Sequence, residues 1–258
     1  MSVKAKKHLG QHFLVDKGIC RKIANQYGSH EDCKRVLEIG PGMGALTYLL
    51  IGQKLDVSVM EIDEESIVYL NENIPELKGK IFEADFLKAD LKEIMGDGQF
   101  SVVGNFPYNI SSQIMFKCLD YRDQIPEIMG MFQKEVAERI AEKPGSKRYG
   151  ILSVLMQAYY DISYCFTVDE HVFDPPPKVK SGVIRCTRNE RKSLPCDEKL
   201  FKQIIKLSFG QRRKTIRNGI KTLIKDTGLE SELLALRPEV LSVEQFVELT
   251  NLVESVQK

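Results

Sequence analysis

The tetrapeptide Asn105-Phe106-Pro107-Tyr108 combines an amide, a proline-restricted backbone and an aromatic ring. It follows the apolar run at residues 100–103, which we interpret as a short buried strand, and it precedes a helical pattern that begins near Ser111. The four residues are therefore expected at the carboxyl end of a strand, where open α/β sheets bind their ligands. They could hold a flat polar group through hydrogen bonds and stacking, and we interpret that group as an adenine.

A glycine turn follows an earlier apolar strand at residues 36–39. Its sequence is Gly40-Pro41-Gly42-Met43-Gly44, and a helical pattern comes next. Strand, glycine turn and helix are typical of the opening of a nucleotide-binding βαβ unit. Glycines let the backbone pass close to a ligand, because no Cβ atom is in the way. The spacing is one residue shorter than the dinucleotide fingerprint G-x-G-x-x-G, so the turn alone is weak evidence.

Two acidic residues follow the next two expected strands, at residues 55–60 and 80–84. Glu61 ends the first of them, where a carboxylate can accept hydrogen bonds from both hydroxyls of a ribose. Asp85 ends the second and could accept the exocyclic amine of an adenine. Each acid alone also fits a helix-capping role. The glycine turn and two acids on three successive strand ends together favour a nucleoside site.

Further strand patterns at residues 127–132, 162–168 and 179–186 complete a set of seven. We expect a Rossmann-like α/β fold whose seven-stranded sheet is mostly parallel with one antiparallel strand. A polar linker begins at Asn189, and two apolar helical stripes follow it, which predicts a small all-α domain. The expected domains are therefore residues 1–188 with the sheet and a basic N-terminal arm, and residues 189–258 with the helices.

The net charge of +1 conceals a strong asymmetry. Residues 178–221 contain 14 basic and 3 acidic residues, whereas residues 36–177 contain 12 basic and 23 acidic residues. Residues 1–35 are also basic. Basic ends that flank an acidic middle suggest that both ends face a polyanion, although a charge run alone often forms only a solvated face. Our candidates for RNA phosphate contacts are Lys147, Arg148, Arg212, Arg213, Lys214 and Arg217.

Composition limits the remaining possibilities. No apolar run approaches the length of a membrane span, and the basic N-terminus lacks the apolar core of a signal peptide, so we expect a cytoplasmic protein. The six cysteines form no C-x-x-C pair, and histidines and cysteines lack ligand spacing. We therefore expect reduced thiols and no metal site.

The glycine turn with Glu61 and Asp85 resembles class I S-adenosylmethionine-dependent methyltransferases, and residues 105–108 resemble the N-x-P-Y signature of enzymes that methylate N6 of adenine. Three further stretches, at residues 10–14, 173–181 and 209–215, resemble the small-subunit ribosomal RNA adenine dimethyltransferase family. The resemblance covers essentially the whole chain. Two positions depart from the family pattern: Phe106 stands where Leu is frequent, and His12 where Asn is common.

The resemblance implies N6-dimethylation of two adjacent adenosines in the 3′-terminal hairpin of small-subunit, 16S-type rRNA during ribosome biogenesis. Asn105 and the Phe106 carbonyl would accept the amine hydrogens, Pro107 would fix their backbone, and Tyr108 and Phe173 would stack on the flipped base. The helical domain would bind RNA in a pre-subunit particle, and we expect a monomer with no protein partner. The S-adenosylmethionine contacts that it implies are His12, Leu14, Gly40, Gly42, Glu61, Ile62, Asp85, Phe86 and Asn105.

Three alternatives stay open at this point. The chain could methylate large-subunit rRNA, as antibiotic-resistance enzymes do, or DNA, although DNA enzymes usually need a larger recognition region. It could be a ribosome assembly factor that acts mainly by binding. It could also be an NAD-dependent oxidoreductase, which the short glycine spacing and the Asn105-to-Tyr108 segment disfavour.

Overall fold

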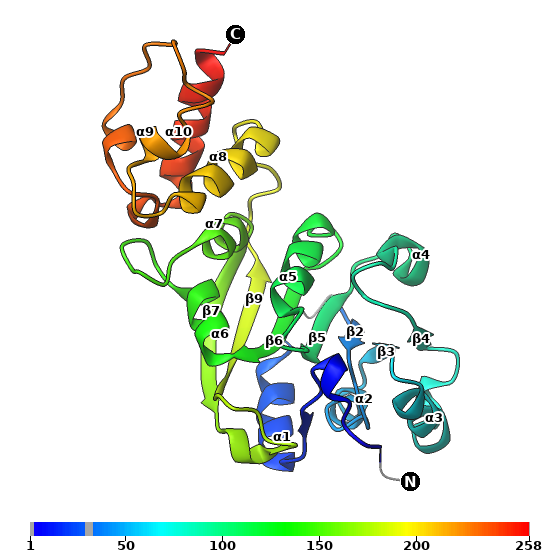
Figure 1. Cartoon of the computed structure of the whole chain (residues 1–258). Coiled ribbons are helices and arrows are strands. Elements are labelled where there is room, and N and C mark those ends of the chain that lie inside the picture. Colours follow the sequence, from blue (N-terminus) through cyan, green and yellow to red (C-terminus); the bar gives the residue numbers. More distant parts are fainter. Residues whose placement is uncertain (1–2, 29–32, 258) are drawn as a thin grey trace. The chain divides into compact units, whose positions relative to one another are not determined.

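Seven of the apolar runs form one sheet with the order β4-β3-β2-β5-β6-β9-β7 (Figure 1). The computed structural model describes residues 3–28 and 33–257. Neighbours among β4, β3, β2, β5 and β6 run parallel, whereas β9 is antiparallel to β6. The expected Rossmann-like, mostly parallel sheet is therefore confirmed. Its strands are β2 (Arg35–Ile39), β3 (Asp56–Glu61), β4 (Ile81–Glu83), β5 (Ser101–Asn105), β6 (Glu127–Gln133), β7 (Tyr160–Val168) and β9 (Ser181–Arg188).

The central strands β2, β5 and β6 are almost continuously buried. Val36, Val102 and Ile128 are all inaccessible to solvent. Near-continuous apolar runs are typical of parallel strands that are covered by helices on both faces. Around this sheet the chain forms α1 (Lys17–Gln26), α2 (Thr47–Gly52), α3 (Glu64–Asn73), α4 (Leu91–Met95), α5 (Ser111–Asp120), α6 (Lys134–Ala141) and the 3-10 turns η1 (Lys7–Leu9), η2 (Pro75–Leu77) and η3 (Glu170–Val172).

A second, two-stranded sheet was not expected from the sequence. It pairs β1 (Phe13–Leu14) antiparallel with β8 (Phe173–Asp174), which places Leu14 opposite Phe173. The Val15 amide donates to the Val172 carbonyl at 3.0 Å and extends the pairing. The N-terminal arm is therefore joined to the segment of residues 172–174, which lies far from it in the sequence.

The chain divides into two compact units, and the division differs from the expected one at residues 138–160. The first unit contains residues up to Ala137 and Asp161–Arg188, and the second contains Glu138–Tyr160 and the residues from Asn189 onwards. Residues 138–160 were expected in the catalytic domain. They join the helical unit because α7 (Ile151–Gln157) packs against α8 (Glu198–Gly210) and α10 (Val243–Ser255).

The second unit is helical, as expected. Its elements are α7, α8 (Glu198–Gly210), α9 (Ile216–Gly219), α10 (Val243–Ser255) and the 3-10 turns η4 (Glu232–Ala235) and η5 (Pro238–Val240). Ser242 and Gln245 form a capping box at the start of α10. Within residues 3–28 and 33–257, no helix is both long and apolar enough to cross a membrane.

Candidate functional site

The carboxyl ends of β2, β3 and β5 form the floor of a cavity in the first unit. It encloses about 500 Å³ of empty space, part of which is open to solvent. The N-terminal arm forms the facing wall, and Figure 1 shows this dark blue segment running past β5. The cavity brings together most of the predicted site residues. They are His12, Gly40, Gly42, Glu61, Ile62, Asn105, Phe106, Pro107 and Tyr108, alongside Leu9, Gly10, Gln11 and Phe13.

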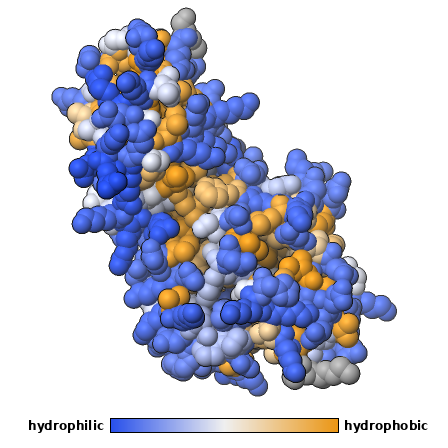
Figure 2. Space-filling view, in the orientation of Figure 1, coloured by the Kyte–Doolittle hydropathy of each residue, from blue (hydrophilic) through white to orange (hydrophobic). Residues whose placement is uncertain are grey.

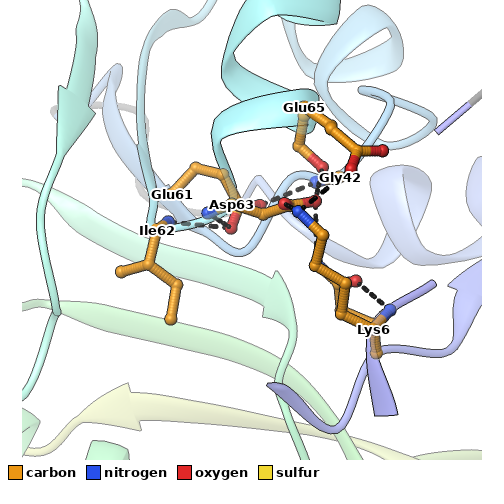
Figure 3. Close-up of polar contacts among 8 residues, drawn as sticks. Lys6, Gly42, Glu61, Ile62, Asp63 and Glu65 are labelled. Atoms are coloured by element: carbon orange, nitrogen blue, oxygen red, sulfur yellow. Dashed lines mark hydrogen bonds and ion pairs between the residues drawn. The ribbon is translucent and has the colours of Figure 1, made fainter. Parts of the chain in front are cut away.

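Glu61 is held in place by three backbone amides (Figure 3). Its Oε1 atom accepts from the amides of Ile62 at 2.8 Å and Asp63 at 3.0 Å, and its Oε2 atom accepts from Gly42 at 3.2 Å. Burial raises the pKa of Glu61, and the three amides oppose that rise. The carboxylate is therefore fixed at the cavity wall with acceptor capacity left for hydroxyl groups.

Asp63 joins the N-terminal arm to the loop after β3. The Lys6 ammonium binds its Oδ1 atom and lies 3.3 Å from Glu65, as Figure 3 shows. Gln11 donates to Oδ2 of Asp63 at 3.2 Å, and Ser66 donates to the same oxygen at 2.8 Å. Burial would raise the pKa of Asp63, but the hydrogen bonds from Lys6, Ser66 and Gln11 hold it below the ordinary value.

The glycine turn is shaped to let another group approach closely. Gly42 has a φ of 55°, and a Cβ atom on it would lie 2.8 Å from the Phe13 ring. A second cavity of about 470 Å³ is lined by Pro41 and Met43 of the turn and shares Phe13, Gly40 and Asn105 with the first. Leu14 lines this second cavity.

Glu38 also lines the second cavity, and the sequence reasoning missed it. Its carboxylate is buried, it accepts a hydrogen bond of 2.6 Å from the Thr47 hydroxyl, and burial raises its pKa to about 7. The available signal was an acid inside an otherwise apolar strand, two residues before the glycine turn. A buried carboxylate with a raised pKa beside a cavity is a common feature of functional sites.

Asn105 ends β5 and faces the N-terminal arm. Its Nδ2 atom donates to the backbone carbonyl of His12 at 2.8 Å. Because the two heteroatoms of an amide point in different directions, this bond fixes the side on which the Oδ1 atom lies. Among the described residues, that oxygen has no hydrogen-bond donor, so it remains an acceptor at the cavity wall.

Phe106 is 1% exposed and packs edge-on against Phe132, with ring centroids 5.2 Å apart. Its ring occupies the space left by two glycines that face each other across β5 and β6, Gly104 and Gly130. A Cβ atom on Gly130 would lie 2.9 Å from Cδ2 of Phe106 and closer still to Cε2. The Phe106 amide donates to the Met131 carbonyl at 3.2 Å.

The Tyr108 ring is fixed from two directions. It stacks on the His12 ring with centroids 5.6 Å apart and an interplanar angle of 26°. Its hydroxyl lies 2.5 Å from the hydroxyl of Ser181, which is buried at the start of β9. Burial raises the pKa of Tyr108, and the hydrogen bond with Ser181 opposes that rise.

Three of the predicted catalytic and cofactor-binding residues line neither cavity. Phe173 is 3% exposed and packs in the core near Leu14. Asp85 lies on a turn, where its Oδ1 atom accepts from the Leu87 amide at 2.9 Å, and Phe86 is buried. Their roles toward base and cofactor stay predictions.

In the second unit, the predicted basic residues differ in what they already bind. Arg212 donates to the Ser146 carbonyl at 3.4 Å, which joins the two basic segments. Arg148 pairs with Glu138 at 3.1 Å, and Arg217 pairs with Glu230 at 2.8 Å. By contrast, Lys147, Arg213 and Lys214 are exposed and form no ion pair with the described residues. The visible face of this unit is mostly hydrophilic in Figure 2.

Comparison with known proteins gives one consistent result. The family model described as ribosomal RNA adenine dimethylase matches residues 2–254. A protein of Parabacteroides distasonis named ribosomal RNA small subunit methyltransferase A is 60% identical over 250 residues, or 96% of this chain and 93% of that protein. Its namesake from Flavobacterium johnsoniae is 58% identical, with 98% and 97% covered.

Solved structures show the same architecture. A dimethyladenosine transferase from Plasmodium falciparum superposes with a TM-score of 0.77 at 23% identity and covers 95% of this chain and 98% of its own. The 23S rRNA methyltransferase ErmE superposes with a TM-score of 0.67 at 25% identity, with 93% and 99% covered.

Proposed function

This chain belongs to the ribosomal RNA adenine dimethylase family, and from that membership we propose that it transfers methyl groups to N6 of two adjacent adenosines near the 3′ end of small-subunit rRNA. The observation that carries the proposal is the Asn105 amide, whose oxygen is directed by the His12 carbonyl. It stands at the wall of the cavity that also contains Glu61. An amide acceptor beside a ribose-binding acid is suited to a reaction between a nucleoside cofactor and a nucleobase amine.

The cavity fits S-adenosylmethionine as the methyl donor. Glu61 offers acceptor capacity for ribose hydroxyls, and Ile62, which is 48% exposed, offers apolar surface for an adenine ring. Gly40 and Gly42 admit close approach of the backbone. Leu14 lines the adjoining second cavity. When bound, the cofactor supplies an electrophilic methyl group.

Asn105 and Phe106 act on the amine of the target adenine. That amine is a poor nucleophile, because its lone pair is delocalised into the ring. Oxygen atoms of the Asn105 side chain and the Phe106 backbone accept its hydrogens and draw the nitrogen towards tetrahedral geometry. Since the acceptors are fixed before the base arrives, positioning and electrostatics supply most of the catalysis. No strong general base is required, because the methylated cation readily loses its proton.

Tyr108 provides a stacking surface for the base once it has left its helix. One face of its ring already contacts His12, so the target adenine uses the opposite face. This differs from a simple sandwich between Tyr108 and Phe173, because Phe173 is buried away from the cavity. Contact between Phe173 and the base would require the segment of residues 173–178 to change its conformation.

Lys147, Arg213 and Lys214 are the strongest candidates for RNA phosphate contacts. They are exposed and unpaired among the described residues, so no ion pair has to break before they bind RNA. Arg148 and Arg217 must first leave Glu138 and Glu230. Basic residues held on one folded unit suit a structured particle such as a small-subunit precursor.

Small-subunit rRNA is favoured over the alternatives. The relatives that share 60% and 58% identity carry a small-subunit name, whereas the 23S rRNA methyltransferase shares 25%. An assembly factor that acts only by binding would not need the directed amide of Asn105 or the fixed carboxylate of Glu61.

Transfer of tritiated methyl groups from S-adenosylmethionine to purified small subunits that lack the modification tests the proposal. Large subunits and duplex DNA serve as parallel substrates, and nucleoside analysis identifies the product. We expect dimethyladenosine from small subunits alone. An Asn105→Ala variant should lose methylation and keep binding to subunits. Label in large subunits or DNA would overturn the assignment of small-subunit rRNA as the substrate. If the cofactor binds but no substrate is labelled, the result would favour an assembly factor that acts mainly by binding.

A further inference from the structure

His12 contacts two proposed catalytic residues and a third segment of the chain. Its carbonyl accepts from Nδ2 of Asn105 at 2.8 Å, and its ring stacks on Tyr108. Its Nδ1 atom lies 2.7 Å from the Pro175 carbonyl, which follows β8. The three contacts use the backbone, a ring face and a ring edge, so one residue can make all of them at once.

We propose that His12 is a positioning residue: its ring is fixed by Pro175 and Tyr108, and its carbonyl thereby sets the orientation of the Asn105 amide. This inference deepens the proposed function and rests on it. A carbonyl can accept only from the amide nitrogen, so the contact excludes the flipped amide, in which Nδ2 would occupy the position of Oδ1. A flipped amide would present donors to the target amine, which needs acceptors.

The His12 side chain adds a further support to a backbone that is held on either side, by the contact of Gln11 with Asp63 and by the short strand β1. His12 lies immediately before β1, which consists of only two residues and pairs with β8. Gly10, two residues earlier, adopts a φ of 68°, where a side chain is rarely accommodated. The contact between the His12 ring and Pro175 therefore ties the arm to the residue that follows β8, in addition to the pairing of β1 with β8.

The carbonyl of Pro175 can only accept a hydrogen bond, so Nδ1 of His12 must carry the hydrogen. The neutral ring is then the Nδ1–H tautomer, and its Nε2 atom is an acceptor. Long-range ¹H–¹⁵N correlation spectra distinguish the two tautomers of each of the four histidines. We expect the His12 resonance, assigned by its loss in His12→Phe, to show the Nδ1–H form, and the Nε2–H form would contradict the proposal.

Two substitutions separate the parts of the side chain. His12→Asn keeps an N–H donor for Pro175 and loses the ring, whereas His12→Phe keeps the ring for Tyr108 and loses the donor. His12→Ala removes both. We expect His12→Ala to lower kcat on small subunits about 10- to 100-fold, because small displacements of catalytic groups have effects of this size. Each of the other two should retain part of the lost rate.

The affinity for the cofactor is measured beside kcat, because His12 also lines the first cavity and can contact the cofactor there. We expect calorimetric titration with S-adenosylmethionine to give a raised Kd for the variants, so kcat is compared at saturating cofactor, where a defect in cofactor binding alone no longer lowers the rate. A kcat that is unchanged at saturation, together with a raised Kd, would show that His12 is only a cofactor contact and overturn the proposal.

A double variant decides whether His12 acts through Asn105. If it does, His12→Ala combined with Asn105→Ala should be no slower than Asn105→Ala alone. If the double variant is slower than Asn105→Ala by the full factor that His12→Ala causes alone, the proposal is overturned. Thermal unfolding of each variant verifies that it is folded. If the unsubstituted protein does not methylate small subunits, the proposed function fails; if it does and the His12 variants match it, only this inference fails.

Discussion

The hydroxyl groups of Tyr108 and Ser181 lie 2.5 Å apart and join two segments that are separated by 73 residues. Tyr108 follows β5, and Ser181 begins β9, where it is buried. A hydroxyl that is held inside the sheet thus fixes the plane of the aromatic ring proposed to receive the target base. Ser181 also ends one of the stretches that resemble the family. Its hydrogen bond with Tyr108 gives a physical reason for a serine at this position.

Replacement of Ser181 by alanine should lower kcat/KM for small subunits about fivefold, since a hydrogen bond of this kind contributes about 1 kcal/mol. Tyr108→Phe removes the same bond from the other side and should have a similar effect. The double variant should be no worse than either single variant. Steady-state methylation kinetics measure all three, and multiplied effects would show that the two hydroxyls act separately.

Gly130→Ala should destabilise the protein by about 1–3 kcal/mol, because the new Cβ atom would overlap the Phe106 ring. Phe106→Leu should restore part of that loss by shortening the side chain that fills the space. Urea unfolding monitored by circular dichroism measures these differences. Gly52→Ala is the matched control, because nothing lies within 4 Å of a Cβ atom there. Equal loss at both glycines would contradict the packing argument.

Lys6→Met should weaken cofactor binding roughly threefold or more, because it removes the charge-assisted bond between the arm and the buried Asp63. The arm would then close the first cavity less firmly. Calorimetric titration with S-adenosylmethionine tests this, and the difference should shrink in high salt. Lys4→Met, in the same basic arm but exposed, should leave the Kd unchanged; an equal effect there would indicate a general charge contribution.

Glu38 should make the free energy of unfolding fall as the pH rises from about 4.5 to about 7. Burial raises its pKa to about 7 in the folded protein, so over this range the folded state binds more protons than the unfolded state. Its stabilising contribution is complete below the ordinary pKa and is lost as the pH passes the raised one. Glu38→Gln should flatten this part of the profile, measured by urea midpoints at several pH values. Glu83→Gln, at an exposed site, should keep the slope.

Arg213→Gln and Lys214→Gln should each weaken binding to small subunits and reduce the slope of log K against log salt by about 1. Arg217→Gln should have a smaller effect, because Arg217 is already paired with Glu230. Filter binding across a range of salt concentrations measures the slopes. Equal slopes for all three variants and the unsubstituted protein would place the RNA contacts elsewhere.

Local patterns predicted the sheet and the glycine turn well. These features depend on neighbours in sequence. The pairing of β1 with β8 was missed because two residues carry no readable alternation. Residues 138–160 were expected with the sheet, whereas they cluster with α8 and α10, which come later in the chain.

The candidate site, like the fold, could be predicted from the sequence only in part. The positions of Glu61 and Asn105 at strand ends could be read from the order of strands. The contacts that direct them could not, because they come from the Gly42 and His12 backbones, and a backbone group leaves no mark in the residue type. Glu38 was missed for a different reason, since a buried acid in an apolar strand was treated as part of the strand.

The contacts of His12 also have a consequence for synthesis of the chain. His12 leaves the ribosome well before its partners, which follow 93 and 163 residues later, at Asn105 and Pro175. The wall of the cofactor cavity can therefore close only after most of the sheet has been translated. Pairings between such distant residues form late, because loop closure must precede them. The nascent chain thus acquires its parallel strands before its binding site, and a release assay on stalled chains should detect cofactor binding only once Pro175 has emerged.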